Sequence, residues 1–396
     1  MASTMQVFVV AGVRTAIGAF GGSLRDVAPA RLAAGVTAEV VRRGGVDPVA
    51  VGQVFFGQVI PTEPGDAYLA RIAALDGGLP ETVPAMTLNR LCGSGLQAVI
   101  SAAQSIVLGD ADVAVGGGAE CMSRAPFLST SMRWGSRMGD TVLVDGLTGA
   151  LTDPFGHILM GVTAENVARR HAVTRADQDA LALVSHQRAS AAIAEGRFKE
   201  QILPVDIKVK GKAAIFDTDE HVRGDVSAEE LAGLRTIFQK DGGTVTAGNA
   251  SGVNDGAAAC LLASAAAVTA HNLRPMARLV SYAHAGVDPA YMGIGPVPAT
   301  RLALQRAGLS VADMDVIESN EAFAAQACAV SRMLDLDPRK VNPNGSGISL
   351  GHPVGATGAI NVVKLVHEMH RSSVRYGLVT MCIGGGQGIS AIFERV

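Results

Sequence analysis

The chain has 396 residues with a formal net charge of −3, and 17% of its residues are charged while 48% are apolar. This length accommodates two or three domains, and the slight negative balance argues against nucleic acid or an anionic membrane as the main partner. The five cysteines are odd in number and irregularly spaced, so a disulfide framework is not expected. They form no CxxC pair, which argues against a structural zinc site, and a reducing, cytoplasmic location fits best.

Strands and helices alternate along the first 120 residues. The patterns predict a strand at 7–13, a helix at 30–43, a strand at 51–59, a helix at 94–108 and a short buried strand at 112–116 that ends in three glycines. This βαβ order is typical of a mostly parallel sheet flanked by helices.

The central part of the chain is richer in charge and in helix. Amphipathic spacing predicts helices at 163–170 and 175–195. Three lysines and an arginine in this part form a basic patch, which is either a solvated face or a site for an anionic substrate tail; its members are Lys208, Lys210, Lys212 and Arg223.

The second half of the chain repeats the first. Residues 45–57 align without gaps with residues 308–320, and ADVAVGGGAE resembles YGLVTMCIGGGQG. In the second half a glycine turn leads directly into a last strand at 388–393, whereas the equivalent strand of the first half, 257–263, comes much later. We therefore predict a duplicated α/β unit. Its N-terminal half spans 1–272 with an inserted loop domain at about 121–250, and its C-terminal half spans 273–396.

Three glycine-rich stretches carry side chains suited to covalent chemistry. Cys92 lies in NRLCGSGLQAV, His352 in SLGHPVGATG and Cys382 in TMCIGGGQG. Cys92 and His352 fall at comparable points of the repeat, each in a turn that opens a helix, where the helix dipole is expected to favour a thiolate. Two thiols and one imidazole suggest a nucleophile, a general base and a shared activator, which favours carbon–carbon bond chemistry on a thioester.

Simpler interpretations apply to other candidates. Cys121, Cys260 and Cys328 lie among apolar neighbours, Cys260 in a strand and Cys328 in a helix, and are interpreted as small buried hydrophobes. Asn320 could be the N-cap of a helix at 322–333. No glycine cluster has the spacing of a dinucleotide-binding or P-loop motif.

Taken together, these motifs resemble the thiolase family over essentially the whole chain. The signatures, in chain order, are VRTAIG, NRLCGSGLQAV, GGGAECMSRAP, MGVTAENVA, TAGNASGVNDGAAA, NEAFAAQ, GHPVGATG and CIGGGQG. The resemblance implies the five-layered αβαβα thiolase fold, built from two duplicated halves with an inserted loop domain. It also implies an acetyl-CoA C-acetyltransferase, or β-ketothiolase, that acts on acetyl-CoA and 3-ketoacyl-CoA.

The resemblance assigns roles to five residues. Cys92 would take the acyl group, His352 would activate it, and Cys382 would move a proton at the acetyl-CoA methyl group. His352 and a water held by Asn320 would form one oxyanion hole, and the backbone N–H groups of Cys92 and Gly384 would form a second. Coenzyme A is then a substrate, and neither a metal nor another cofactor is expected.

The resemblance also implies a coenzyme A site and an oligomer. The expected members of the site are Arg223, Phe238, Ala247 and Ser251 on the loop domain, with Leu151, Met160, Ala322 and Phe323 around the pantetheine and acyl end. The segment MRWGSRMGD at 132–140 resembles the tetramerisation loop of tetrameric members. A homotetramer, formed as a dimer of dimers, is therefore expected.

Three features depart from the usual family pattern. Leu159 stands where acetoacetyl-CoA thiolases usually have His, and Cys121 replaces a common Ser. Residues 344–350, Asn-Gly-Ser-Gly-Ile-Ser-Leu, differ from the commoner Gly-Gly-Ala-Ile-Ala pattern. Because Leu159 puts the acyl chain-length preference in doubt, a longer-chain degradative 3-ketoacyl-CoA thiolase remains an alternative function.

Three other classes of protein fit these residues less well. A decarboxylating ketoacyl synthase pairs its nucleophile with two histidines, whereas the second partner here is Cys382. A non-catalytic carrier would lack Cys92 or His352, and a papain-like hydrolase would not need the Cys382 motif.

Overall fold

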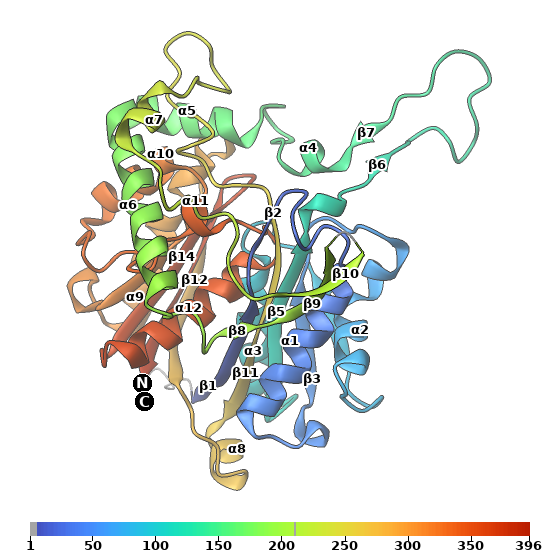
Figure 1. The fold of residues 1–396 in the computed structure, drawn as a ribbon. Helices are drawn as coiled ribbons and strands as arrows, with labels where there is room; N and C mark the ends of the chain where they lie inside the picture. The colour runs from blue at the N-terminus through green and yellow to red at the C-terminus, as the bar shows by residue number, and fades with distance from the viewer. Residues whose placement is uncertain (1–5, 210) are drawn as a thin grey trace.

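Two sets of strands with the same order meet at the centre of the fold, in a computed structural model that describes residues 6–209 and 211–396 (Figure 1). The N-terminal set runs in the order β1 (Val7–Thr15), β11 (Asn254–Ser264), β5 (Val113–Cys121), β3 (Gln53–Gly57) and β4 (Ala85–Leu88). The C-terminal set runs in the order β12 (Ala277–Gly286), β15 (Gln387–Arg395), β14 (Tyr376–Ile383) and β13 (Val316–Ser319). The two sets are joined through β1 and β12, which pair antiparallel.

The predicted internal repeat is visible element by element. Helices α1 (Pro29–Gly44) and α9 (Pro296–Ala307) end at Gly45 and Gly308, whose φ angles of 66° and 67° suit glycine. At the same distance after each glycine, β3 and β13 begin, and each pairs parallel with the next strand of its own set. The ungapped alignment of the two halves is therefore confirmed.

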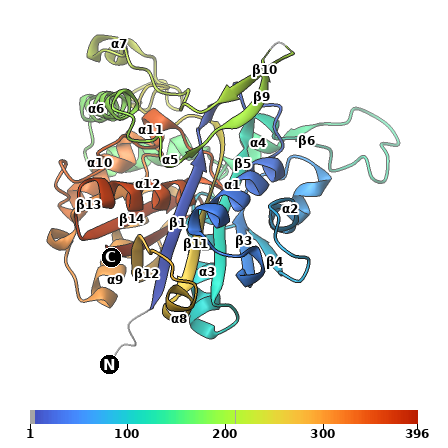
Figure 2. The same ribbon diagram turned by 60° about the horizontal axis from the view of Figure 1, so that its bottom comes forward.

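Helices and strand sets alternate as five layers (Figures 1 and 2). Helices α3 (Ser94–Leu108) and α12 (Thr357–Arg371) pack against each other between the two strand sets. Helix α1, with α2 (Leu69–Asp76) beside it, covers the outer face of the N-terminal set, and α9 covers the outer face of the C-terminal set. The predicted α/β fold class is confirmed.

The segment between β5 and β11 contains most of the remaining elements. Its helices are α4 (Gly146–Ala150), α5 (Met160–Arg170), α6 (Arg175–Ala194) and α7 (Ala228–Gly233). Its strands are β6 (Phe127–Leu128) and β7 (Val144–Asp145), which form an arm that projects from the body in Figure 1, β8 (Ile202–Leu203), and the hairpin of β9 (Val205–Val209) and β10 (Lys212–Phe216). Elsewhere lie β2 (Gly18–Ala19), α8 (Ala265–Ala270), α10 (Ala324–Leu334) and α11 (Gly347–Leu350).

The predicted elements agree with the structure apart from the length of one strand. The short strand predicted at 112–116, ending in glycines 116–118, is longer than expected: β5 continues through these glycines to Cys121 and is buried along its whole length. A Cβ atom at Gly117 would lie 2.5 Å from the carbonyl oxygen of Ala258, and one at Gly118 would lie 2.2 Å from that of Gly355. These glycines therefore allow close packing within the strand, whereas their counterparts after β14 do form a turn.

Among the described residues, only the helical segment 91–108 has the length and hydropathy to cross a membrane. Most of this segment is buried in the fold, because α3 packs against α12 and the strands β3, β5 and β11.

Helices α3 and α12 approach each other too closely at one point for a side chain to fit between them. A Cβ atom at Gly358 would lie 2.2 Å from the backbone nitrogen of Leu96. Gly358→Ala should therefore lower the free energy of unfolding by about 1–3 kcal/mol, because overpacking forces backbone shifts. Urea unfolding measures this loss. Gly149→Ala in α4 is the control, because a Cβ atom added at Gly149 would have no neighbour within 4 Å; the substitution should be neutral or slightly stabilising. An equal loss of unfolding free energy in both variants would contradict the prediction.

Candidate active site

One cavity of about 390 Å³ brings together the predicted reactive groups from both halves of the chain. Cys92, His352 and Cys382 all line this cavity. Every residue predicted to contact coenzyme A also lines it, namely Leu151, Met160, Arg223, Phe238, Ala247, Ser251, Ala322 and Phe323. Asn320 and Gly384 do not line the cavity but touch residues that do, as described below.

Cys92 lies in a tight turn just before α3. Leu91 has a φ of 47°, which is uncommon for a residue with a side chain. The turn is held by Ser94, whose Oγ accepts from the Arg90 backbone N–H at 2.8 Å and donates to the Leu91 carbonyl at 2.7 Å. A Cβ atom at Gly93 would lie 2.5 Å from Ile383, so the turn packs tightly against the end of β14. The half-buried Cys92 is thereby fixed at the start of the helix.

His352 is held by hydrogen bonds at its backbone and at its ring. Its backbone N–H donates to Asn254 Oδ1 at 2.9 Å, and its Nδ1 lies 2.7 Å from Thr357 Oγ1. The Thr357 hydroxyl donates its proton to the Pro353 carbonyl at 2.8 Å, so it can only accept from His352. The contact therefore places the proton on Nδ1 and leaves Nε2 as the free base of the ring. Gly351, with a φ of 114°, permits the backbone to pass close to Asn254.

Asn320 faces the free ring nitrogen of His352. Its Nδ2 lies 3.4 Å from His352 Nε2, and its Oδ1 is buried with no hydrogen-bond partner among the described residues. Its backbone N–H donates to the Thr380 carbonyl at 3.0 Å, which fixes it beside β14. The alternative in which Asn320 caps a helix is wrong, because the N-cap of α10 is Phe323.

Cys382 lies near the end of β14 and is 1% exposed. The chain then turns through Gly385 and Gly386, whose φ angles are 78° and 82°. This turn brings the backbone N–H of Gly384 to the Cys92 thiol, where the N–H of Cys92 itself also points. Two backbone donors thus converge where the acyl carbonyl of a Cys92 thioester would lie.

Burial decides the charge of all three reactive groups. It lowers the pKa of His352 to about 4 and raises the pKa of the Cys382 thiol, and repulsion from an ionised Cys92 raises the Cys382 pKa further. The N–H groups at the helix start do favour a Cys92 thiolate, as expected, but burial disfavours it more strongly. Burial raises the pKa of Cys92, and the N–H groups of Gly384 and Cys92 oppose this shift without reversing it. The resting site holds two thiols and a neutral imidazole able to take a proton.

Glu120, which the sequence analysis did not single out, ties the two halves together beneath the site. Its fully buried carboxylate accepts from the backbone N–H groups of Val59 at 2.9 Å, Ile60 at 3.1 Å and Gly355 at 2.9 Å. Gly355 belongs to the turn that follows His352. Burial raises the pKa of Glu120 to about 8, while the three N–H donors oppose the rise. The sequence signal that could have identified Glu120 is its position as a charged residue directly after the glycines of the GGGAE motif.

The remaining candidates fall away from the reactive groups. Cys121 and Cys260 are fully buried and Cys328 packs against a core cluster, and none of the three lines the cavity. Lys208 and Lys212 are exposed on the β9–β10 hairpin, and Lys210 lies outside the described residues. Among the described members of the basic patch, Arg223 alone lines the cavity. Lining residues that the sequence analysis missed include His221, Ile237, Met292 and Val354. No cluster of three potential metal ligands occurs in the described part of the chain.

The chain belongs to the thiolase family. The family model described as "Thiolase, N-terminal domain" matches residues 7–266, and "Thiolase, C-terminal domain" matches residues 273–395. Together they cover almost the whole chain, including every reactive group described above.

Named relatives are similar over their full length. Beta-ketothiolase BktB of Cupriavidus necator is 64% identical over 99% of this chain and 100% of its own. The crystal structure of Bacillus anthracis acetyl-CoA acetyltransferase superimposes with a TM-score of 0.97 at 47% identity, covering 100% of both chains. Human mitochondrial 3-ketoacyl-CoA thiolase in complex with CoA gives a TM-score of 0.95 at 45% identity, covering 98% of both chains.

The charge of Glu120 contributes to the raised pKa of Cys92, which can be tested without any substrate. Glu120→Gln should shift the alkylation of Cys92 by iodoacetamide to lower pH, because removing a nearby negative charge favours the thiolate. Since the Glu120 pKa is about 8, its charge is complete only above that pH, and the largest difference is expected in alkaline solution. Mass spectrometry of the Cys92 peptide across pH measures the shift.

Glu63→Gln is the matched control, because Glu63 is partly exposed and pairs with Arg124 at 2.8 Å. It should leave the Cys92 profile unchanged. Identical profiles for Glu120→Gln and the wild type would contradict a charge effect of Glu120 on Cys92.

Proposed function

We propose that this protein is an acetyl-CoA C-acetyltransferase of the β-ketothiolase type, which transfers an acyl group through Cys92. The reaction is reversible: acetyl-CoA condenses with acyl-CoA, or 3-ketoacyl-CoA is cleaved by coenzyme A. The observation that carries the proposal is the convergence of Cys92, Cys382 and a neutral His352 from the two halves of the chain on one cavity. The thiolase family membership of the chain supports the same activity.

In the direction of cleavage, the first half-reaction breaks a carbon–carbon bond. His352 Nε2 takes the proton of Cys92, and the thiolate attacks the keto carbonyl of 3-ketoacyl-CoA. The carbonyl oxygen becomes negative in the tetrahedral intermediate, where the N–H groups of Cys92 and Gly384 stabilise it. The bond to the α-carbon then breaks, and the Cys382 thiol protonates the acetyl-CoA enolate. The raised pKa of Cys382 keeps that proton available at neutral pH.

The second half-reaction returns the enzyme to its resting state. Coenzyme A enters, the Cys382 thiolate takes the proton of its thiol, and the resulting thiolate attacks the acyl-Cys92 thioester. The Cys92 thiolate leaves and recovers its proton from the imidazolium of His352. In the first half-reaction, Asn320, which lies 3.4 Å from His352 Nε2, would place a water beside the enolate oxygen. This water and the His352 imidazolium, which donates from Nε2, then share the charge of the enolate. Condensation follows the same steps in reverse.

The cavity lining suits coenzyme A as a substrate. Arg223 supplies a cation for phosphate groups, while Phe238, Leu151 and Met160 supply an apolar path for the pantetheine arm. A similar thiolase has been solved in complex with CoA, which supports this placement. The nucleophile, the base and the acid of the proposed reaction are all side chains, so the proposal includes no metal and no redox cofactor.

The direct test of the proposal is the position of the acyl label. Incubation with labelled acetyl-CoA, followed by digestion and mass spectrometry, should place the label on Cys92, because its thiolate is the attacking group. Cys92→Ala should carry no label and show no acyl transfer, while circular dichroism of the variant remains that of the wild type. A label on any other residue, or full activity of Cys92→Ala, would reject the assignment.

Leu159 offers a test of chain length, because it lines the cavity next to Met160 and is 38% exposed. Its apolar wall should favour a longer acyl chain by about 0.8 kcal/mol for each methylene that it buries. We predict that five- and six-carbon 3-ketoacyl-CoA is cleaved comparably to acetoacetyl-CoA. Leu159→His should narrow the preference toward four carbons by several-fold, within the ~1–3 kcal/mol that one methylene can contribute.

Leu75→His is the matched control, since Leu75 in α2 is 41% exposed and does not line the cavity. kcat/KM for cleavage of four- to eight-carbon substrates by all three proteins decides the question. An unchanged profile in Leu159→His would mean that other lining residues set the chain length. A steady rise toward eight carbons in the wild type would favour the alternative, a longer-chain degradative thiolase.

We also propose a homotetramer, assembled as a dimer of dimers through the β6–β7 arm. The arm exposes large apolar side chains, including Met132, Trp134 and Met138, which are 59%, 90% and 94% exposed. Such a patch is typical of an interface between proteins. Light scattering should give a tetramer for the wild type and a dimer for Trp134→Glu combined with Met138→Glu. A wild-type dimer at micromolar concentration would reject the proposal.

Two further assignments complete the proposal. The chain divides into an N-terminal half, 1–272, with a loop domain at about 121–250, and a C-terminal half, 273–396. The two strand sets of matching order support this division. A cytoplasmic location suits five cysteines that are all free in the structure, two of them needed as thiols for the proposed reaction.

A further inference from the structure

Glu321, the residue after Asn320, is a carboxylate buried behind the active site. It is 4% exposed, and burial raises its pKa. Its Oε2 accepts from Ser185 Oγ at 2.6 Å and its Oε1 accepts from Asn342 Nδ2 at 2.9 Å. A carboxylate is costly at such a place unless its oxygens are bonded, so these donors fix the side chain of Glu321 tightly.

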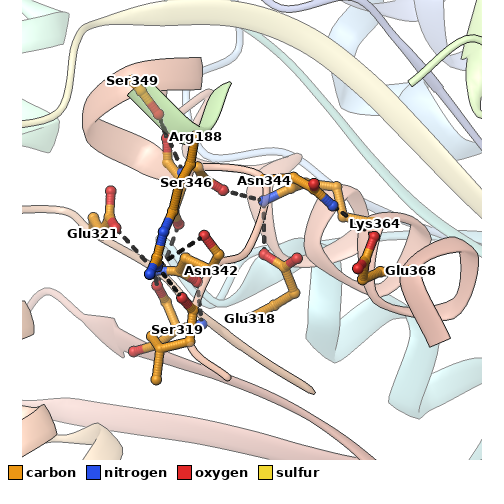
Figure 3. Close-up of polar contacts among 12 residues, drawn as sticks. Arg188, Glu318, Ser319, Glu321, Asn342, Asn344, Ser346, Ser349, Lys364 and Glu368 are labelled. Atoms are coloured by element: carbon orange, nitrogen blue, oxygen red, sulfur yellow. Dashed lines mark hydrogen bonds and ion pairs between the residues drawn. The ribbon is translucent and has the colours of Figure 1, made fainter. Parts of the chain in front are cut away.

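Asn342 holds the residues on both sides of Asn320 (Figure 3). Its Oδ1 accepts from the Ser319 backbone N–H at 2.9 Å, and its Nδ2 donates to the Ser319 carbonyl at 2.8 Å as well as to Glu321. The buried Asn342 side chain therefore holds the residues immediately before and after Asn320. The side-chain amide of Asn320 faces His352, with Nδ2 at 3.4 Å from Nε2 of the ring.

Two serines, Ser185 and Ser349, connect Glu321 to the segment that precedes His352. Ser349 Oγ, in α11, lies 2.8 Å from Ser185 Oγ. In the same helix, a Cβ atom at Gly347 would be 3.0 Å from Asn320 Oδ1 and 2.7 Å from the Glu321 carbonyl oxygen. Positions 347 and 349 are two of those at which the sequence departs from the commoner Gly-Gly-Ala-Ile-Ala pattern. Position 347 thus falls at the contact between α11 and Asn320, and position 349 at the contact between α11 and Ser185.

We propose that Ser185, Glu321, Asn342 and Ser349, here called the Glu321 cluster, act as positioning residues that hold the Asn320 amide against His352. The inference deepens the proposed function and rests on it for its kinetic consequence. None of the four side chains lines the catalytic cavity, so none touches substrate. The cluster connects α6 of the loop domain, the end of β13 and α11 at one buried point, and a shift of any one of them moves Asn320.

The neighbour of Ser185 on α6 explains why substrate binding should survive loss of the cluster. His186 Nδ1 accepts from the backbone N–H of Arg223 at 3.1 Å, and Arg223 lines the catalytic cavity. Removing the Ser185 hydroxyl leaves this contact in place. The expected result is therefore a fall in kcat with little change in KM.

Ser185→Ala is the primary test, with Ser190→Ala as the matched control on the same helix. Ser190 Oγ is buried and has no hydrogen-bond partner among the described residues, so its removal should leave the site unchanged. For cleavage of acetoacetyl-CoA by coenzyme A, Ser185→Ala should lower kcat by about 10- to 100-fold, because a displacement of about 1 Å at a reacting group can cost that much. KM should stay within about twofold of the wild type, and Ser190→Ala should match the wild type in both.

Crystal structures of the wild type and both variants separate the cluster from the proposed function. The Asn320 Nδ2 to His352 Nε2 separation should lengthen in Ser185→Ala and remain unchanged in Ser190→Ala. An unchanged separation in Ser185→Ala would overturn the positioning role whatever the activity. A wild type that transfers no acyl group would overturn the proposed function, while the separations would still decide whether the cluster positions Asn320.

Ser349→Ala keeps the test decisive if Ser185→Ala does not fold. Alanine is the residue of the commoner pattern at this position, so the variant should fold. It removes the hydroxyl that contacts Ser185 but leaves the Ser185–Glu321 hydrogen bond, so a smaller fall in kcat, of about 2- to 10-fold, is expected. A kcat equal to that of the wild type in both variants would overturn the proposal.

Discussion

The close approach of α3 and α12 is the constraint on which the active site depends. A Cβ atom at Gly95 would lie 2.6 Å from the backbone nitrogen of Ala359, and Gly358 meets Leu96 still more closely. Backbone therefore packs on backbone where the two helices begin. Cys92 precedes one helix and His352 precedes the other, so this contact brings a residue of each half to the same cavity. The repeat supplies two similar helix starts, and the glycines allow them to meet.

Burial then determines which chemistry the assembled groups can perform. At a helix start with two converging N–H groups, a thiolate would be stabilised in an open site, but the desolvation cost is larger here and Cys92 keeps its proton. The same burial keeps His352 neutral and Cys382 protonated. Each charge in the proposed reaction must therefore arise by proton transfer inside the site, next to donors already in place. Such an arrangement stabilises charge as it develops rather than in the resting state.

The sequence predicted the fold and the lining of the site well, because local patterns encode both. The repeat could be seen from the glycine-terminated helices and the strands that follow them, and the motifs identified the cavity residues. The strand at 112–116 was predicted too short, because a run of glycines does not show that a strand continues until the backbone that packs on it is known. Glu120 and the Glu321 cluster were missed, because their partners lie far away in the sequence. The protonation of Cys92 depends on burial, which no local pattern reports.

The central claim is that two cysteines in one cavity perform different tasks, Cys92 as the nucleophile and Cys382 as the acid and base. Cys382→Ala tests it most directly when both half-reactions are measured on the same preparation. We predict that acetyl-CoA still acylates Cys92, but more slowly, because Cys382 no longer protonates the departing coenzyme A thiolate. Formation of acetoacetyl-CoA should fall by a factor on the order of 10² or more, because it also needs a proton removed from carbon. Normal condensation by Cys382→Ala, or loss of acylation in parallel with condensation, would contradict the account.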